Sequence, residues 1–161
     1  MRVITGSARG RRLKDLPGLD TRPTTDKVKE SIFNIVQFDV EGRRVLDLFA
    51  GTGQLGIEAL SRGAEKCVFV DRSREAVKVV KENVTSTGFE NQSQVIQGDG
   101  VSFLTSCREK FGLIFLDPPY AADLLEKALL KIAEIDIVAE NGIIVCESAL
   151  DKILPQLPAP Y

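Results

Sequence analysis

The segment that most constrains the fold is residues 45–53, VLDLFAGTG, in which an apolar stretch runs directly into glycine. Gly51, Gly53 and Gly56 form the pattern G-x-G-x-x-G, which lets the backbone turn tightly and approach a ligand closely before a helix begins. A nucleotide-like ligand at the end of a strand is therefore the first hypothesis. A tight turn without any ligand can use the same glycines, so the hypothesis needs support from elsewhere in the chain.

From Arg44 onward, strand-like and helix-like stretches alternate. The predicted strands are residues 44–49, 66–71, 93–97, 113–117 and 142–147, and the predicted helices are residues 54–62, 73–87, 100–109 and 122–133. Unbroken apolar strands that alternate with helices predict an α/β fold, with a mostly parallel sheet covered by helices on both faces. Ligands of such sheets bind beyond the carboxyl ends of the strands.

The length and the apolar pattern indicate one domain. We expect the 161 residues to form a single unit, with residues 1–40 as an arm and helix and residues 41–161 as the core. No stretch approaches the roughly 20 apolar residues of a membrane span, so we expect a cytoplasmic protein with no membrane partner. Nothing in the sequence demands a partner subunit, and a monomer is the default expectation.

Residue types that often carry chemistry are scarce in this chain. It contains no histidine, which excludes Ser-His and Cys-His arrangements and removes the commonest zinc ligand. Cys67, Cys107 and Cys146 lie far apart in apolar surroundings and read as core residues, so neither a disulfide nor a metal site is expected. Any reaction must rely on carboxylates, backbone groups, a tyrosine or a cofactor.

The net charge of −2 conceals a basic N-terminal arm. Residues 1–29 carry a balance of +5, and the remainder carries −7. A short hairpin is predicted, with residues 2–5 and 11–14 flanking a basic turn at residues 6–10, followed by a helix over residues 27–37. The helix should be capped by Thr25 or Asp26, and its apolar stripe is predicted to be Val28, Ile32, Ile35 and Val36. A basic arm on an acidic body suggests contact with a polyanion, although a solvated surface hairpin has the same composition.

Two further strand ends carry acidic residues. Asp71 ends the second predicted strand, where a carboxylate can accept hydrogen bonds from both hydroxyls of a ribose, in NAD-binding and adenosyl-methionine-binding sheets alike. Gly98 and Asp99 follow the third strand, where Asp99 could bind the amino group of an adenine. Taken alone, Asp99 reads as a helix cap.

The fourth predicted strand ends in Asp117-Pro118-Pro119-Tyr120, which indicates the class of chemistry. An amino group on a base ring is a poor nucleophile because its lone pair is donated into the ring. The Asp117 carboxylate and the Pro118 carbonyl could each accept one amino hydrogen and hold the nitrogen in line with a methyl donor. Tyr120 could stack on the face of a base taken out of its helix.

These motifs resemble the adenosyl-methionine-dependent methyltransferases that modify exocyclic amines of nucleic-acid bases. Three blocks of the N-terminal arm narrow the resemblance to the bacterial RsmD family, which methylates the N2 amine of a guanine in small-subunit (16S) ribosomal RNA. The blocks are residues 6–13 (GSARGRRL), residues 21–25 (TRPTT) and residues 30–34 (ESIFN). The resemblance implies a Rossmann-like class I methyltransferase fold with S-adenosyl-L-methionine as cofactor and a small ribosomal subunit, or an intermediate in its assembly, as partner.

The resemblance also implies roles for individual residues. The expected cofactor-binding residues are Asp47, Phe49, Ala50, Gly51, Thr52, Gly53, Asp71, Arg72, Gly98 and Asp99. The expected catalytic residues are Asp117, Pro118, Pro119 and Tyr120, and the expected substrate-binding residues are Arg9, Arg11, Arg12, Arg22, Pro23 and Thr24. Members of this family usually continue into a further helix and an antiparallel strand pair, whereas residues 157–161 (LPAPY) carry no strand signal, so we expect that pair to be missing.

Several other functions remain open at this point. A nicotinamide-dependent oxidoreductase fits the glycine pattern and Asp71, but it does not require the motif that begins at Asp117. A ribosome-assembly factor without turnover fits the basic arm. Among methyltransferases, adenine N6, cytosine N4 and the glutamine amide of a protein release factor present a similar amine or amide, and only the N-terminal resemblance favours guanine N2.

Overall fold

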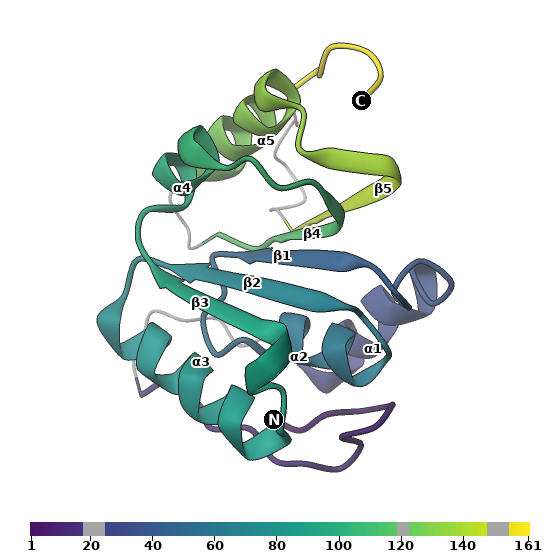
Figure 1. The fold of residues 1–161 in the computed structure, drawn as a ribbon, viewed down its shortest axis with the longest axis vertical. Helices are drawn as coiled ribbons and strands as arrows, with labels where there is room; N and C mark the ends of the chain where they lie inside the picture. Colours follow the sequence, from purple (N-terminus) through teal and green to yellow (C-terminus); the bar gives the residue numbers. More distant parts are fainter. Residues whose placement is uncertain (18–24, 119–122, 148–154) are drawn as a thin grey trace.

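The computed structural model describes residues 1–17, 25–118, 123–147 and 155–161 (Figure 1). Within them, the helices are α1 (Asp26–Ile35), α2 (Gln54–Ser61), α3 (Arg74–Thr87), a 3-10 turn (Glu90–Gln92), α4 (Gly100–Ser106) and α5 (Leu124–Ile135). The strands are β1 (Arg44–Leu48), β2 (Lys66–Asp71), β3 (Ser93–Gln97), β4 (Phe111–Leu116) and β5 (Val138–Cys146). None of the described helices is long and apolar enough to cross a membrane.

The predicted parallel sheet is confirmed. Its strand order is β3-β2-β1-β4-β5 and every pair is parallel, so all five strands end at the same edge. In the centre, Leu46 of β1 lies between Val68 of β2 and Ile114 of β4. Residues 155–161 form no strand.

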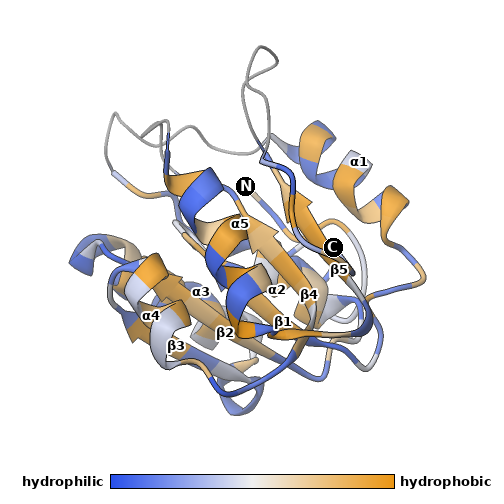
Figure 2. Cartoon of the chain, turned by 90° about the horizontal axis from the view of Figure 1, so that it is seen from above, coloured by the Kyte–Doolittle hydropathy of each residue, from blue (hydrophilic) through white to orange (hydrophobic). Residues whose placement is uncertain are grey.

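Helices cover both faces of the sheet, as predicted. The helices α1, α2 and α3 lie on one face, and α4 and α5 lie on the other (Figure 1). Alternate residues of a strand point to opposite faces, so Cys67 and Phe69 pack towards α2 while Val68 and Val70 pack towards α4 and α5. The three central strands β1, β2 and β4 are therefore mostly apolar on both faces, whereas the edge strand β3 (SQVIQ) is largely polar (Figure 2).

The ends of several elements differ from the prediction for local reasons. The strand β1 stops at Leu48 because Phe49 has a φ of 65°, which is outside the extended region. The strand β5 begins at Val138 rather than at residue 142, and its register against β4 shifts between Phe111 and Leu113. The helix α4 ends at Ser106, where Cys107 is extended.

The predicted apolar stripe of α1 is wrong in part. Thr25 caps this helix as expected, but Val28 and Ile35 face solvent, and Ile35 is 81% exposed. The buried residues of the helix are Lys29 and Phe33. Phe33 packs against Phe115 of β4, with ring centroids 5.6 Å apart. A lysine therefore occupies the core where the sequence pattern had predicted only apolar side chains.

The predicted N-terminal hairpin is present and packs on the core. Val3 N–H donates to Arg11 at 2.9 Å and Leu13 N–H donates to Met1 at 3.0 Å, although only Arg2 and Arg12 form a formal antiparallel bridge. The turn of the hairpin lies at Ser61, where the hydroxyl accepts from Ala8 N–H at 3.0 Å. The arm therefore runs along α2, with its turn at the carboxyl end of that helix.

Candidate functional site

The candidate site lies at the edge of the sheet where the strands end. The glycine loop, residues 49–53, follows β1 and leads into α2. Asp71 ends β2, Gly98 and Asp99 follow β3, and Asp117 and Pro118 follow β4. The parallel order places β1 between β2 and β4, so the glycine loop has Asp71 on one side and Asp117 on the other.

Asp71 has a structural role that the sequence did not reveal. One of its carboxylate oxygens accepts from Gly51 N–H at 2.8 Å, and the other accepts from Ser73 N–H at 2.8 Å. Asp71 thus holds the glycine loop in place across two strands. A carboxylate has about four acceptor positions, so both oxygens retain capacity for hydroxyl groups of a ligand. Arg72, next in the chain, is exposed.

The glycine loop is bordered by open space. A Cβ atom added to Gly51 or Gly98 would meet no atom of the described chain within 4 Å. By contrast, Gly53 has a φ of 81° and a Cβ there would lie 3.2 Å from Val80, and a Cβ at Gly56 would lie 2.4 Å from Phe69. Gly53 thus allows the loop to pack closely on α3, Gly56 allows α2 to pack closely on β2, and Gly51 and Gly98 leave room for a ligand.

The backbone and ring at the start of the loop are fixed by packing. Ala50 N–H donates to Val70 at 2.9 Å and continues the pairing of β1 with β2. Phe49, in its left-handed conformation, lies against Gly100, where an added Cβ would come within 2.9 Å of the ring. The ring therefore contributes a half-buried apolar surface beside the strand ends.

Asp47 lies beneath the loop rather than on its surface. It is 2% exposed, and its carboxylate accepts from Gly56 N–H of α2 at 3.0 Å. Burial raises the pKa of this carboxyl well above its usual value, and the charges of Asp117 and Asp71 raise it further, while the hydrogen bond from Gly56 opposes the shift. The pairing with Gly56 shows that Asp47 ties β1 to the beginning of α2.

We expect Asp47→Asn to remove part of the pH dependence of stability. An aspartate with a raised pKa holds its proton in the folded state, so the wild-type free energy of unfolding falls as the pH rises above about 4. Asparagine keeps an oxygen for Gly56 N–H but does not ionise. Denaturant unfolding at pH 5, 6.5 and 8 should therefore show the free energy of unfolding of the variant rising relative to that of wild type as the pH rises. An equal difference at all three values would contradict the raised pKa.

Asp99 is a helix cap, as the sequence taken alone predicted. Its carboxylate accepts from Ser102 N–H and from the Ser102 hydroxyl, both at 3.0 Å, at the beginning of α4. Asp99 is exposed, and Gly98 N–H donates to the Asp71 carbonyl at 2.9 Å. Asp71 and Asp99 are therefore brought to one stretch of the sheet edge, on β2 and on its neighbour β3.

Asp117 and Pro118 lie on the other side of the glycine loop. Both are half-buried at the end of β4, which is buried along its length. The charge of Asp117 acts on Asp47, which places the two carboxylates in one electrostatic environment. Five residues of the prediction, Pro119, Tyr120, Arg22, Pro23 and Thr24, lie outside the described residues.

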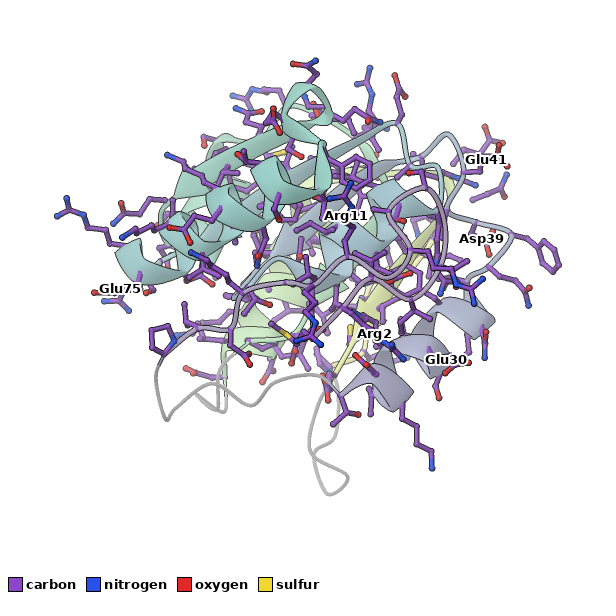
Figure 3. All side chains as sticks on the ribbon, turned by 90° about the horizontal axis from the view of Figure 1, so that it is seen from below. Arg2, Arg11, Glu30, Asp39, Glu41 and Glu75 are labelled. Atoms are coloured by element: carbon purple, nitrogen blue, oxygen red, sulfur yellow. The ribbon has the colours of Figure 1, made fainter. Side chains whose placement is uncertain are left out.

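The arginines of the arm form a separate surface. Arg9, Arg11 and Arg12 are exposed on the hairpin. Figure 3 shows Arg2 and Arg11 on one face, with Glu75 towards one rim and Asp39 and Glu41 towards the other. The hairpin turn packs at Ser61, so Arg9 lies at the carboxyl end of α2, whereas the glycine loop leads into the opposite end of that helix. The second strand of the hairpin returns towards that loop, because Leu13 pairs with Met1 and the Met1 sulfur lies 3.7 Å from the Thr52 hydroxyl.

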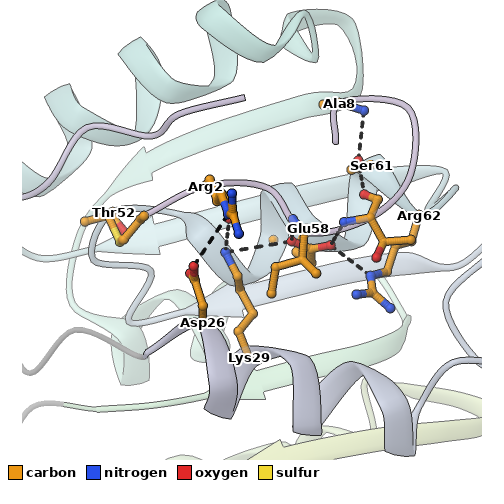
Figure 4. Close-up of polar contacts among 12 residues, drawn as sticks. Arg2, Ala8, Asp26, Lys29, Thr52, Glu58, Ser61 and Arg62 are labelled. Carbon is orange, nitrogen blue, oxygen red and sulfur yellow. Dashed lines mark hydrogen bonds and ion pairs between the residues drawn. The ribbon is translucent and has the colours of Figure 1, made fainter. Parts of the chain in front are cut away.

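Among the buried polar residues that the sequence analysis missed, Glu58 and Asn83 contact the arm. Glu58 of α2 is fully buried and accepts from Ile4 N–H at 2.8 Å and Thr5 N–H at 3.0 Å (Figure 4). Asn83 of α3 is 1% exposed and joins the arm to the glycine loop. The sequence offered two signals for these contacts, the basic composition of the arm and the polar residues of α2 and α3. Neither signal indicates which side chain pairs with which backbone group.

Comparisons with known proteins match nearly the whole chain. The family model described as conserved hypothetical protein 95 matches residues 1–160. YlbH of Bacillus subtilis (strain 168) is 48% identical over 159 residues, which cover 97% of this chain and 86% of that protein. Ribosomal RNA small subunit methyltransferase D of Escherichia coli (strain K12) is 35% identical over 163 residues, which cover 100% of this chain and 81% of that protein.

A solved structure gives the same result for the fold. The Escherichia coli protein yhhF superposes with a TM-score of 0.89 at 31% sequence identity, covering 99% of this chain and 86% of that one. The similarity thus extends over the arm, the glycine loop and the strand ends together.

Proposed function

The chain belongs to the family of ribosomal RNA small subunit methyltransferase D, and from this premise we propose that it methylates the N2 amine of a guanine in small-subunit (16S) ribosomal RNA. Its Rossmann-like class I methyltransferase fold supports S-adenosyl-L-methionine as the methyl donor. The proposed setting is a small ribosomal subunit or an intermediate in its assembly. We further propose that the chain works as one domain and as a monomer, without a metal.

The observation that carries this proposal is the position of Asp117 and Pro118 beside the glycine loop. Asp71 fixes that loop through Gly51 N–H, and the backbones of Gly51 and Gly98 border open space. Asp117 and Pro118, on one side of the loop, offer two acceptors for the hydrogens of an amine. Asp71, on the other side, has acceptor positions left for the ribose of a nucleoside-bearing methyl donor.

The residues present fit the cofactor. Asp71 would accept from the ribose hydroxyls, and the backbone of residues 49–53, above the buried Asp47, would surround the methionine part. Phe49, Gly98, Asp99 and Arg72 would lie towards the adenine. When bound, S-adenosyl-L-methionine supplies an electrophilic methyl group on a sulfonium.

The chain's own groups act on the nucleophile. The Asp117 carboxylate and the Pro118 carbonyl each accept one hydrogen of the guanine amine, which orients the nitrogen lone pair away from the ring. This activation depends on geometry and hydrogen bonding rather than on a strong base, which suits a chain without histidine. Pro119 stiffens the segment, and Tyr120 stacks on the guanine ring. Arg22, Pro23 and Thr24 lie near cofactor and substrate in this proposal.

The hairpin arginines are proposed to bind RNA phosphates away from the reacting base. Arg9, Arg11 and Arg12 are exposed along one segment of the hairpin, outside the glycine loop and the strand ends. Phosphate contacts of this kind fix the register of the RNA and carry little sequence information.

Replacing Arg11 and Arg12 together with alanine should weaken RNA binding uniformly across sequences. Each lost phosphate contact reduces the magnitude of the slope of log K against log salt concentration by about one. The slope of the double variant should therefore be smaller than that of wild type by about two. Fluorescence titrations of an RNA oligomer between 50 and 300 mM salt, taken as approximate bounds, measure this slope. Lys110→Ala, an exposed cation just before β4, is the control and should keep the wild-type slope. A double variant with the wild-type slope would place the RNA elsewhere.

The proposal is tested first by cofactor choice and by the nucleic acid that is labelled. Calorimetric titration should show binding of S-adenosyl-L-methionine and none of NADH, whereas the reverse would support an oxidoreductase. Label from the methyl group should then enter unmodified small subunits or naked ribosomal RNA and not duplex DNA. Label in DNA alone would favour adenine N6 or cytosine N4 methylation, and RNA binding without any transfer would favour an assembly factor.

A further inference from the structure

The side chain of Asn83 connects three segments that are far apart in sequence. Its Nδ2 donates to the Lys14 carbonyl at 3.1 Å and to the Thr52 carbonyl at 2.9 Å, and its Oδ1 accepts from Lys14 N–H at 2.7 Å. Asn83 is 1% exposed, so these bonds have no competition from water. One buried amide on α3 therefore joins the arm to the glycine loop.

The contact with Lys14 fixes the arm at its end. The amide of Asn83 pairs with both the N–H and the carbonyl of Lys14, as a neighbouring strand would. The Lys14 ammonium adds an ion pair with Glu82 at 2.8 Å. Because Leu13 N–H donates to Met1, Lys14 belongs to the same hairpin block that carries Arg11 and Arg12.

The contact with Thr52 fixes the glycine loop at a second point, next to the one that Asp71 holds. Asp71 accepts from Gly51 N–H at 2.8 Å, and Asn83 donates to the carbonyl of the following residue, Thr52, at 2.9 Å. The loop has positive φ angles at Gly51, between these contacts, and at Gly53, directly after them, so it depends on such contacts to keep one conformation. Met1 also reaches Thr52, with 3.7 Å between its sulfur and the hydroxyl.

We propose that Asn83 is a positioning residue that couples the arm to the glycine loop, so that binding of RNA to the arm and of cofactor to the loop strengthen each other. This inference rests on the proposed function, because it takes RNA and S-adenosyl-L-methionine as the two ligands. Asn83 contacts neither ligand. It acts by allowing one conformation of the loop only while the arm is docked, and ordering by one ligand lowers the cost of ordering for the other.

The coupling is measured as a ratio of two RNA affinities. The Kd of a small-subunit RNA fragment is determined with and without saturating S-adenosyl-homocysteine, which occupies the cofactor site without reacting. For wild type, we expect the product to tighten RNA binding at least about fivefold. For Asn83→Asp, which keeps the acceptor for Lys14 N–H but cannot donate to either carbonyl, the ratio should fall to about one.

Two comparisons separate coupling from stability and from the proposed function. Ser86→Ala removes a hydroxyl that donates to the Asn83 carbonyl on the same helix and should keep the wild-type ratio. All measurements are made well below the melting temperatures of the variants, so a purely structural role for Asn83 would leave the ratio unchanged. An unchanged ratio in Asn83→Asp, or a ratio of one in wild type, overturns the inference. Failure of wild type to bind S-adenosyl-homocysteine at all would overturn the proposed function instead.

Discussion

Replacing Asp117 with alanine should reduce the rate of methyl transfer by about 10²- to 10³-fold, the effect of removing one polar group that acts on a reacting centre. The substitution deletes one of two acceptors for the amine hydrogens, and the lone pair then stays conjugated with the ring. Asp117→Asn should lose less, because one amide oxygen can still accept. Single-turnover transfer from labelled S-adenosyl-L-methionine to unmodified RNA measures both.

The Asp117 effect should be confined to the chemical step. Asp117 follows β4 at a half-buried position, so cofactor affinity and RNA affinity should stay near wild type. Glu134→Ala changes an exposed carboxylate on α5 and provides the matched control, which should transfer at the wild-type rate. Methyl transfer by Asp117→Ala at the wild-type rate would contradict the proposed mechanism, even if the methylated product were unchanged.

The second large effect is expected at Glu58, the centre of a buried ionic network. Glu58 and Lys29 are both 0% exposed, with 3.7 Å between the ammonium and the carboxylate. Arg62 donates to the same carboxylate at 2.9 Å, and Lys29 also donates to the Arg2 carbonyl at 2.7 Å (Figure 4). One glutamate therefore joins α1, α2 and the arm.

Glu58→Ala should lower the free energy of unfolding by about 3–5 kcal/mol, because it leaves a buried ammonium and two backbone N–H groups without their acceptor. Denaturant unfolding at neutral pH measures this loss. Glu109→Ala, which breaks the more exposed Lys66–Glu109 pair, should cost less than about 1 kcal/mol. Similar losses in the two variants would contradict the network.

The Glu58 variant should also acquire a distinctive pH dependence. Burial already lowers the pKa of Lys29, and Glu58 opposes that shift, so removing Glu58 lowers the pKa further. A lysine with a lowered pKa is less protonated when folded than when unfolded, so stability is lost below the folded-state pKa and recovers as the pH rises towards 10, about the usual lysine value. The deficit of Glu58→Ala should therefore shrink with rising pH. The double variant Lys29→Met, Glu58→Gln has no buried charge at these positions and should keep a constant deficit.

The sheet and the edge that carries the site were predictable because they depend on local patterns. Apolar strands, glycine turns and acidic strand ends each occupy a few consecutive residues, and β2 and β3 were placed without error. Asp99 was predicted as a cap, and Thr25 as one of two candidate caps, because capping is a contact over three residues.

The contacts between distant segments were not predictable. A lysine on a helix normally faces solvent, and the residues next to Lys29 in the sequence do not indicate that its partner is Glu58, 29 positions later. Asp71 was assigned to a ligand alone, whereas the structure also gives it Gly51 N–H from the adjacent strand end. Nothing in the sequence indicated that Asn83 is buried, because an asparagine on a helix is normally a surface residue. In each case the polar side chain acquires its role from the topology.

The exposed apolar residues illustrate the same limit from the other direction. Val28 and Ile35 were placed in the core by helical periodicity, yet Phe33 and Lys29 take the face that packs on β4 and α2. Periodicity gives the width of an apolar stripe but not its centre when a charged residue lies within it. Because Lys29 is buried with Glu58, the face of α1 that packs on the core is centred on Lys29 and Phe33 rather than on Val28 and Ile35.

The most direct test of the central claim is the identity of the modified nucleoside. RNA from unmodified small subunits is incubated with the protein and S-adenosyl-L-methionine, digested to nucleosides and separated against standards by mass spectrometry. The account predicts N2-methylguanosine, absent from the Asp117→Ala reaction. N6-methyladenosine or N4-methylcytidine in its place would keep the fold and the cofactor but would contradict the proposed base.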